Sequence, residues 1–159
     1  MPALAAEPSP SFRPPYYLQV ICESTSGSNL DARAPSQPTP DVIEQLLIAR
    51  ILGAHGLQRI QTFRQYQPGW DFGEGQPMSE SAYRYMSQFL RHVILPPNKR
   101  PSVFLGATGN LELAWEDESN KRFQAEFSPT AVEYSREDTG AEGELDASEI
   151  IRAAEILSV

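Results

Sequence analysis

Reactive and metal-binding side chains are scarce in this chain of 159 residues. Cys22 is the only cysteine, and His55 and His92 are the only histidines. One cysteine excludes a disulfide framework, a cysteine-rich zinc site and a Cys-x-x-Cys redox pair. Such sparing use of cysteine is typical of the reducing cytoplasm, so we expect a cytoplasmic protein.

Long apolar runs are also lacking. The sequence contains no run of about eighteen apolar residues, the length that a membrane-spanning helix needs. The N-terminus lacks the charged start and long apolar core of a signal peptide. From these two absences we expect a soluble protein without a membrane partner.

Prolines are plentiful but unevenly spread. Eight of the fourteen lie at or before Pro40, among Ser and Ala residues without hydrophobic periodicity. Proline has no amide donor and steers its neighbour away from the helical conformation, so residues 1–39 are predicted to be an extended or disordered tail. Residues 40–159 are predicted to form a single domain. A short apolar run at 16–22 could add an edge strand, dock on a partner or pack on its own domain.

The predicted domain begins with a helical pattern interrupted by glycine. Asp41 precedes Glu44 by three residues, which is the spacing of a capping box and predicts a helix start. The apolar residues that follow are spread widely around the helix, so we expect it to be largely buried. Gly53 and Gly56 predict a break, after which the helix resumes over residues 57–66.

A glycine-rich turn precedes the best amphipathic helix of the sequence. We expect Trp70 to anchor this turn in the core and the Asp71 carboxylate to accept hydrogen bonds from backbone amides of the turn. Ser79 is expected to cap the helix that follows. The residues predicted to organise the turn are Gly69, Trp70, Asp71, Gly73, Gly75 and Ser79. The apolar stripe of the helix comprises Ala82, Tyr85, Met86, Phe89, Leu90 and Val93.

Apolar and polar residues alternate after Pro101, which is the pattern of half-buried strands. Short polar turns separate the alternating runs, which predicts an antiparallel meander with one face covered by helices and one wet, acidic face. Residues 137–146 are expected to form an acidic loop, and Asp146 to begin a last helix. The predicted fold class is therefore α+β, with a four-stranded antiparallel meander covered by helices. The inward residues of the four strands are Val103 and Leu105; Leu111, Leu113 and Trp115; Phe123, Ala125 and Phe127; and Val132 and Tyr134.

Negative charge is concentrated in the C-terminal third. The formal net charge of the chain is −8, but residues 112–155 alone carry thirteen acidic and four basic side chains, a local net charge of −9. Such a surface repels phosphate backbones and suits a basic protein partner. A solvated acidic face also keeps a protein soluble, and the sequence leaves both interpretations open. The candidate partner-binding residues are Glu112, Glu116, Glu126 and Glu133.

No combination of residues has the pattern of a catalytic or cofactor site. Asp71 and Glu74 place two carboxylates in the glycine-rich turn, fewer than calcium loops use. The glycines lack the preceding strand and the following Gly-Lys-Ser/Thr of a phosphate loop. Basic residues between positions 50 and 100 are too scattered for a nucleic-acid-binding motif. We therefore predict no catalytic residue, no metal and no cofactor, and the sequence argues against direct nucleic-acid binding.

The turn and the elements after it resemble a group of small bacterial proteins of uncharacterised function that share a GWDGxGAxPxS turn. The likeness covers residues 66–157, with Phe72 in place of the usual Gly and Gln76 in place of the usual Ala. The resemblance implies an α+β fold and a bacterial or mobile-element origin, and it implies no activity. It is compatible with small accessory proteins encoded beside a toxin or a defence effector. The matching residues of the turn are Gly69, Trp70, Asp71, Gly73, Gly75, Pro77 and Ser79.

These observations favour a non-enzymatic protein-binding module that modulates or inhibits a partner protein, with an acidic sheet face or a sheet edge as its contact. An antitoxin-like protein or a defence-system accessory subunit belongs to this class. The alternative is a small enzyme or ligand-binding domain with its site at the turn around Trp70. Nothing in the sequence supports an enzyme, and nothing in it identifies the partner or the oligomeric state.

Overall fold

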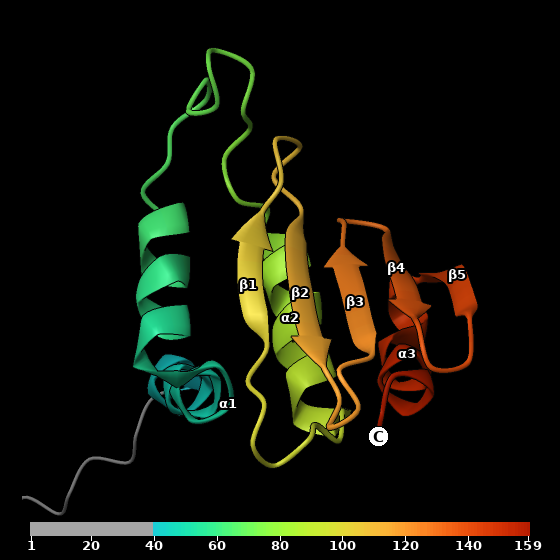
Figure 1. Ribbon diagram of the computed structural model, residues 1–159. Coiled ribbons are helices and arrows are strands. Elements are labelled where there is room, and N and C mark those ends of the chain that lie inside the picture. Colours follow the sequence, from blue (N-terminus) through green and yellow to red (C-terminus); the bar gives the residue numbers. More distant parts are fainter. Residues whose placement is uncertain (1–39) are drawn as a thin grey trace, which may run out of the picture. The chain divides into compact units, whose positions relative to one another are not determined.

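The computed structural model describes residues 40–159, so the predicted tail and its apolar run at 16–22 lie outside the described residues. The described chain contains helices and an antiparallel sheet (Figure 1), which confirms the predicted α+β class. No helix in this part of the chain is both long and apolar enough to cross a membrane. The helices are α1 (Pro40–Phe63), α2 (Glu80–His92) and α3 (Ile150–Ile156), with a 3₁₀ turn at Ala147–Glu149. The strands are β1 (Ser102–Leu105), β2 (Leu111–Glu116), β3 (Arg122–Phe127), β4 (Ala131–Arg136) and β5 (Ala141–Asp146).

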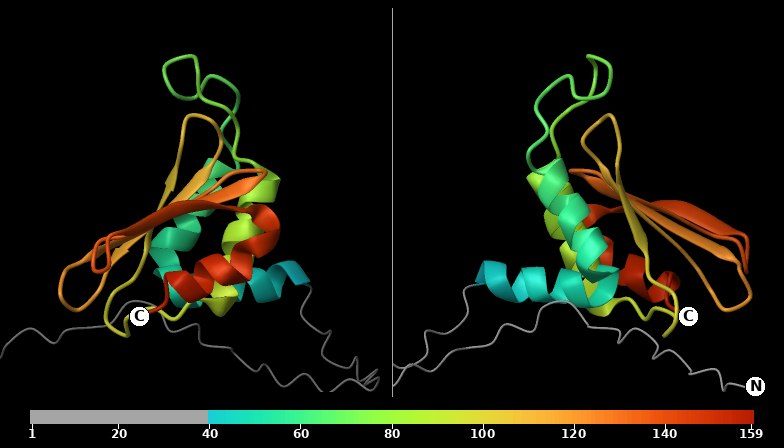
Figure 2. Two further views of the ribbon diagram at one scale, coloured as in Figure 1. Left: turned by 90° about the vertical axis from the view of Figure 1, so that its right-hand side faces the viewer. Right: turned by 60° about the vertical axis from the view of Figure 1, so that its left-hand side comes forward.

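The five strands form one antiparallel meander in the order β1-β2-β3-β4-β5. Short turns join successive strands, so each strand pairs with its neighbour in sequence. Figure 2 shows that α2, α3 and the second half of α1 lie on one side of the sheet. None of the described helices covers the other side, which is therefore the open face of the sheet in this part of the chain.

The prediction of four strands was wrong, because residues 141–146 form β5 rather than a loop. The strand pairs with β4 over its whole length, and Tyr134 lies opposite Gly143. A Cβ atom on residue 143 would come within 2.9 Å of the Tyr134 hydroxyl and 3.1 Å of its ring carbon Cζ. The phenol ring of β4 thus occupies the space that a side chain of β5 would need, and β5 places only one large apolar residue, Leu145, toward the core.

Helix α1 consists of two segments joined at Gly53, where the backbone has φ 76° and ψ 175°. This conformation favours glycine, and the break occurs at the first of the two glycines that predicted it. The first segment is not largely buried, contrary to our expectation. Val42, Ile43 and Leu46 are exposed there. The bend sends the beginning of this segment away from the sheet, whereas Ile48 and Leu52, nearer the bend, are buried in the core. The structure does not describe the side chain of Asp41, so its capping role stays a prediction.

The core lies between the sheet and helices α2 and α3. Phe89 of α2 is fully buried, and its ring meets the edge of Phe127 at 5.2 Å between centroids. Trp115 and Phe123 stack across β2 and β3 at 5.7 Å. Helix α3 packs on α2 and against β4 and β5. The helices therefore cover the apolar face of the sheet, and most polar residues of the strands are left on the open face. Arg136 at the end of β4 is an exception, since its guanidinium lies 5.1 Å from the centroid of the buried Phe123 ring and donates to the Ile156 carbonyl of α3. The buried residues of α3 and its flanks are Ala147, Ile150, Ala153, Ala154 and Leu157.

Candidate functional site

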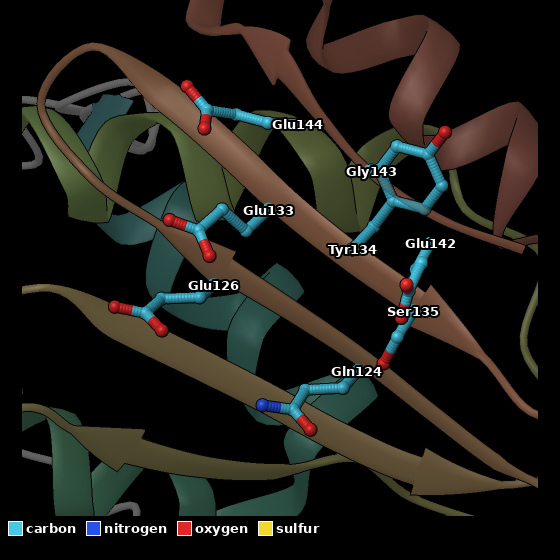
Figure 3. A pocket seen from close by; sticks show the side chains of 8 residues that line it. All are labelled: Gln124, Glu126, Glu133, Tyr134, Ser135, Glu142, Gly143 and Glu144. Carbon is cyan, nitrogen blue, oxygen red and sulfur yellow. The ribbon is translucent and has the colours of Figure 1, made fainter.

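Four glutamates stand opposite one another across four adjacent strands of the open face. Glu112 of β2 pairs with Glu126 of β3, Glu126 pairs with Glu133 of β4, and Glu133 pairs with Glu144 of β5. We call these four residues the glutamate row. Directly opposite residues have Cβ atoms about 4.5–5.5 Å apart. Figure 3 shows the last three, with their carboxylates pointing to the same side of the sheet.

No cation neutralises the glutamate row within residues 40–159. None of the ion pairs of this part of the chain includes Glu112, Glu126, Glu133 or Glu144. The Asn110 side chain donates one hydrogen bond to Glu126, with 2.9 Å between Nδ2 and Oε1. Like charges placed directly opposite destabilise a sheet, so the row opposes the stability of the domain that carries it.

The electrostatic cost of the row is visible at Glu112. Partial burial, and then repulsion by the Glu126 carboxylate, raise the pKa of Glu112 above its ordinary value. Both causes disfavour the ionised carboxylate. The negative charge of Glu112 is therefore less favourable in the folded domain than on a carboxylate fully exposed to water.

Three members of the row, Glu126, Glu133 and Glu144, line a hollow of about 490 Å³ on the β3–β5 half of the open face together with Glu142. Four carboxylates line this hollow, and no lysine, arginine or histidine does. A second hollow, of about 430 Å³, lies on the β1–β3 half and includes Lys99, Arg100 and Arg122 among its lining residues. The unbalanced negative charge is therefore on the half of the face nearest β5. The residues that line the first hollow are Gln124, Glu126, Glu133, Tyr134, Ser135, Glu142, Gly143 and Glu144 (Figure 3).

Three of the four candidate glutamates lie in the row. The fourth, Glu116, stands opposite Arg122 on β3 and pairs with Lys99, whose Nζ lies 3.5 Å from its carboxylate. Glu116 therefore has basic neighbours that the row lacks. Glu144 was missed because its segment was expected to be a loop. A signal was present, since acidic residues alternate with Ala141, Gly143 and Leu145 at the two-residue period of a strand.

The glycine-rich turn forms a separate feature, the Trp70 loop (residues 67–76), between α1 and α2. The Trp70 indole stacks on Tyr66 at 4.9 Å and donates from Nε1 to the Gln76 carbonyl at 2.7 Å. Gly75 is buried beneath the indole, and a Cβ atom there would come within 2.7 Å of Nε1. The loop is closed by a hydrogen bond from the Gly69 amide to the Gly75 carbonyl.

Two expectations for this loop need correction, while Ser79 has the role described for it. Trp70 is half-buried and lies outside the core, so it organises the loop rather than anchoring it in the core. The Asp71 carboxylate accepts none of the hydrogen bonds found among residues 40–159. Asp71 instead accepts one through its backbone carbonyl, from the Glu74 amide at 2.9 Å. Ser79 is the N-cap of α2, and its hydroxyl accepts from the Ala82 amide at 3.2 Å.

Known proteins offer no match for this chain. No protein-family model, no curated protein and no solved structure matches the chain. The likeness of the Trp70 loop to the GWDGxGAxPxS turn therefore rests on the motif alone. Function has to be argued from the geometry and charge of the open face and the loop.

Proposed function

We propose that the domain is a non-enzymatic binding module that docks its glutamate row on a basic surface of another protein and thereby modulates or inhibits that protein. The observation that carries this proposal is the alignment of four carboxylates without a neutralising cation among residues 40–159. A surface that serves only solubility needs dispersed charges and no such alignment. An aligned row lowers stability, which is expected where charge serves binding.

A basic partner would relieve the repulsion between the carboxylates of the row. Neighbouring strands lie about 4.8 Å apart, so the row presents a carboxylate at roughly that interval across the sheet. Lysine or arginine side chains of a partner, inserted along the row, would turn three repulsive contacts into attractive ones. Complementary charge of this kind mainly accelerates encounter and selects the partner. A protein with a cationic groove, such as one that binds phosphate backbones, is the class of partner that fits, and covering its groove would inhibit it.

The test compares two pairs of substitutions that remove the same charge. Glu133→Gln with Glu144→Gln alters the row, while Glu118→Gln with Glu155→Gln alters exposed glutamates in the β2–β3 turn and on α3. Each tagged protein is produced in the cells that naturally contain it, and bound proteins are quantified by mass spectrometry. The row variant should lose a stoichiometric basic protein that the wild type and the control variant retain.

Two results would contradict the proposal. If the row variant captures the same proteins as the wild type, the row is not the contact. If both variants lose the partner equally, net charge rather than the row governs binding. For the purified pair, the affinity should fall as salt rises from about 0.05 to 0.5 M, because screening shortens the reach of surface charges.

A further inference from the structure

Phe72 is the most exposed large apolar residue of the described chain, with a relative accessibility of 104%. It lies in the Trp70 loop, which projects beyond the helices and the sheet at the top of Figure 1. Phe72 belongs to neither the core nor the apolar residues packed against the core. The fold of the domain therefore gains nothing from this aromatic ring.

The backbone around Phe72 is held in place by the loop itself. The Gly73 amide donates to the Gly69 carbonyl at 3.0 Å, and the Glu74 amide donates to the Asp71 carbonyl at 2.9 Å. These two hydrogen bonds straddle Phe72, and the Trp70 indole fills the inside of the loop beneath them. Phe72 is thus a ring on a fixed support, which reduces the conformational entropy that binding would have to remove.

The conformation of Phe72 makes its presence harder to explain by folding. Its φ angle is +48°, in the left-handed region that glycine and asparagine adopt readily and other residues disfavour. Glycine occupies the other loop positions with positive φ, Gly69 and Gly73. A fully exposed aromatic residue in this strained conformation is expected where a role other than folding requires it.

We propose that Phe72 is a preformed anchor that inserts into an apolar pocket with a cationic rim on the partner protein. Asp71 and Glu74 lie on either side of Phe72 in the sequence, and residues 65–83 contain no lysine, arginine or histidine. The acidic flanks disfavour insertion into an anionic bilayer and fit a pocket edged by basic side chains. Aromatic side chains that fill such pockets commonly dominate the affinity of an interface.

The Trp70 loop lies close to one end of the glutamate row, which runs from Glu112 on β2 to Glu144 on β5. The Gln76 amide donates to Ala107 at 2.7 Å and the Ser79 amide donates to Gly109 at 2.9 Å, which ties the loop to the β1–β2 turn. Glu112, the first member of the row, directly follows that turn on β2. One partner can therefore contact the loop and the Glu112 end of the row together. The inference rests on the proposed function in this one respect, since it takes the partner to be the same basic protein.

The first test places a photo-crosslinker where Phe72 stands. The full chain carries p-benzoylphenylalanine at position 72, or as a control at position 151, where Ile151 is exposed on α3, on the side of the sheet away from the glutamate row. Both proteins are irradiated in the cells that naturally contain the chain. Position 72 should form one adduct, with a partner segment that lines an apolar pocket edged by lysine or arginine. An absence of adducts, adducts with many proteins or with a second copy of the chain, or equal adducts from position 151 would overturn the inference.

The second test measures affinity for the crosslinked partner after purification. Phe72→Ser should weaken binding at least about 30-fold, the effect expected of a dominant contact, while Phe72→Trp should retain most of the affinity. The loss should persist in high salt, because it comes from an apolar contact. Thermal unfolding serves as the folding control, and Phe72→Ser should melt no lower than the wild type.

The two proposals fail in distinguishable ways. If Phe72→Ser binds like the wild type while the Glu133→Gln/Glu144→Gln variant is weakened, Phe72 is no anchor and the row still binds. If the row variant binds normally at every salt concentration while Phe72→Ser is weakened, the anchor stands and the role of the row is wrong. Vesicles of phosphatidylcholine and phosphatidylglycerol should leave the Trp70 fluorescence unchanged, and a blue shift on adding them would identify a membrane contact instead.

Discussion

Reversing the central charge of the glutamate row should stabilise the isolated domain and abolish partner binding. Glu133 is exposed and faces a glutamate on each side, Glu126 on β3 and Glu144 on β5. The substitution Glu133→Lys converts two repulsive cross-strand pairs into two attractive ones. Most single substitutions destabilise a protein, so a gain in stability here would be a specific consequence of the row.

The size of the effect follows from the two pairs. A cross-strand charge pair contributes about 0.2–1 kcal/mol, and exposed pairs lie near the lower end of that range. Reversing the sign at both neighbours of Glu133 should therefore raise the free energy of unfolding by about 1 kcal/mol at low salt. For a domain of this size, that corresponds to a rise of about 3–5 °C in Tm. Glu133→Gln removes the repulsion without adding attraction, so it should give about half of this gain.

Urea and thermal denaturation of the domain provide the measurement, at low salt and at about 1 M salt, where the Debye length shrinks to about 3 Å. The gain should largely disappear in high salt. Glu118→Lys, in the β2–β3 turn, makes the same change in net charge away from the row and should give a smaller gain. The reasoning would be refuted if Glu133→Lys lowered the Tm, if the gain were unchanged in high salt, or if Glu118→Lys matched it.

Three further substitutions test individual contacts. Glu112→Gln should be more stable than the wild type at pH 7, because the raised pKa of Glu112 means that the ionised carboxylate is disfavoured in the folded state. Protonation of Glu112 relieves this cost as the pH falls through the raised pKa, so the advantage of the variant in urea titrations should shrink as the pH is lowered. Gly109→Ala should lower the free energy of unfolding by about 1–3 kcal/mol in the same assay, because Gly109 has φ +84° and a Cβ atom there would collide with the Pro77 carbonyl. An unchanged urea midpoint would show that the β1–β2 turn can move to make room for the methyl group. Ser79→Ala should cost about 1 kcal/mol through loss of the N-cap hydrogen bond to Ala82, and Ser79→Asp should restore most of it if capping is the cause.

Local patterns were sufficient to predict the elements with strong periodicity. Helix α2 has an apolar stripe at spacings of three and four, and Phe89 and Leu90 are buried as that stripe predicts. Strands β2 and β3 alternate strictly, so Leu113 and Ala125 face the core while the glutamates between them face outward. The bend at Gly53 was also predictable, since two nearby glycines rarely continue a helix unbroken.

The features that sequence could not give depend on contacts between distant residues. Strand β5 places a glycine opposite Tyr134, and only the fold shows that this ring fills the empty position. The glutamate row depends on the register of four strands, whereas alternation predicts only that three of its members share a face. Trp70 is large enough for a core residue, but the loop projects too far for its indole to reach the core, and the ring stacks on Tyr66 instead.

Two features of this domain are opposed to what folding favours. The glutamate row sets like charges opposite one another, and Phe72 places an aromatic ring in solvent on a left-handed backbone. Each feature lowers the stability of the free domain. A bound partner would relieve the repulsion within the row and bury the Phe72 ring. Their physical roles would differ, because surface charge acts over about 10 Å and speeds encounter, whereas a buried aromatic contact slows dissociation. A basic protein drawn to the row and then held at Phe72 would use both, which is why we propose that both features serve partner recognition.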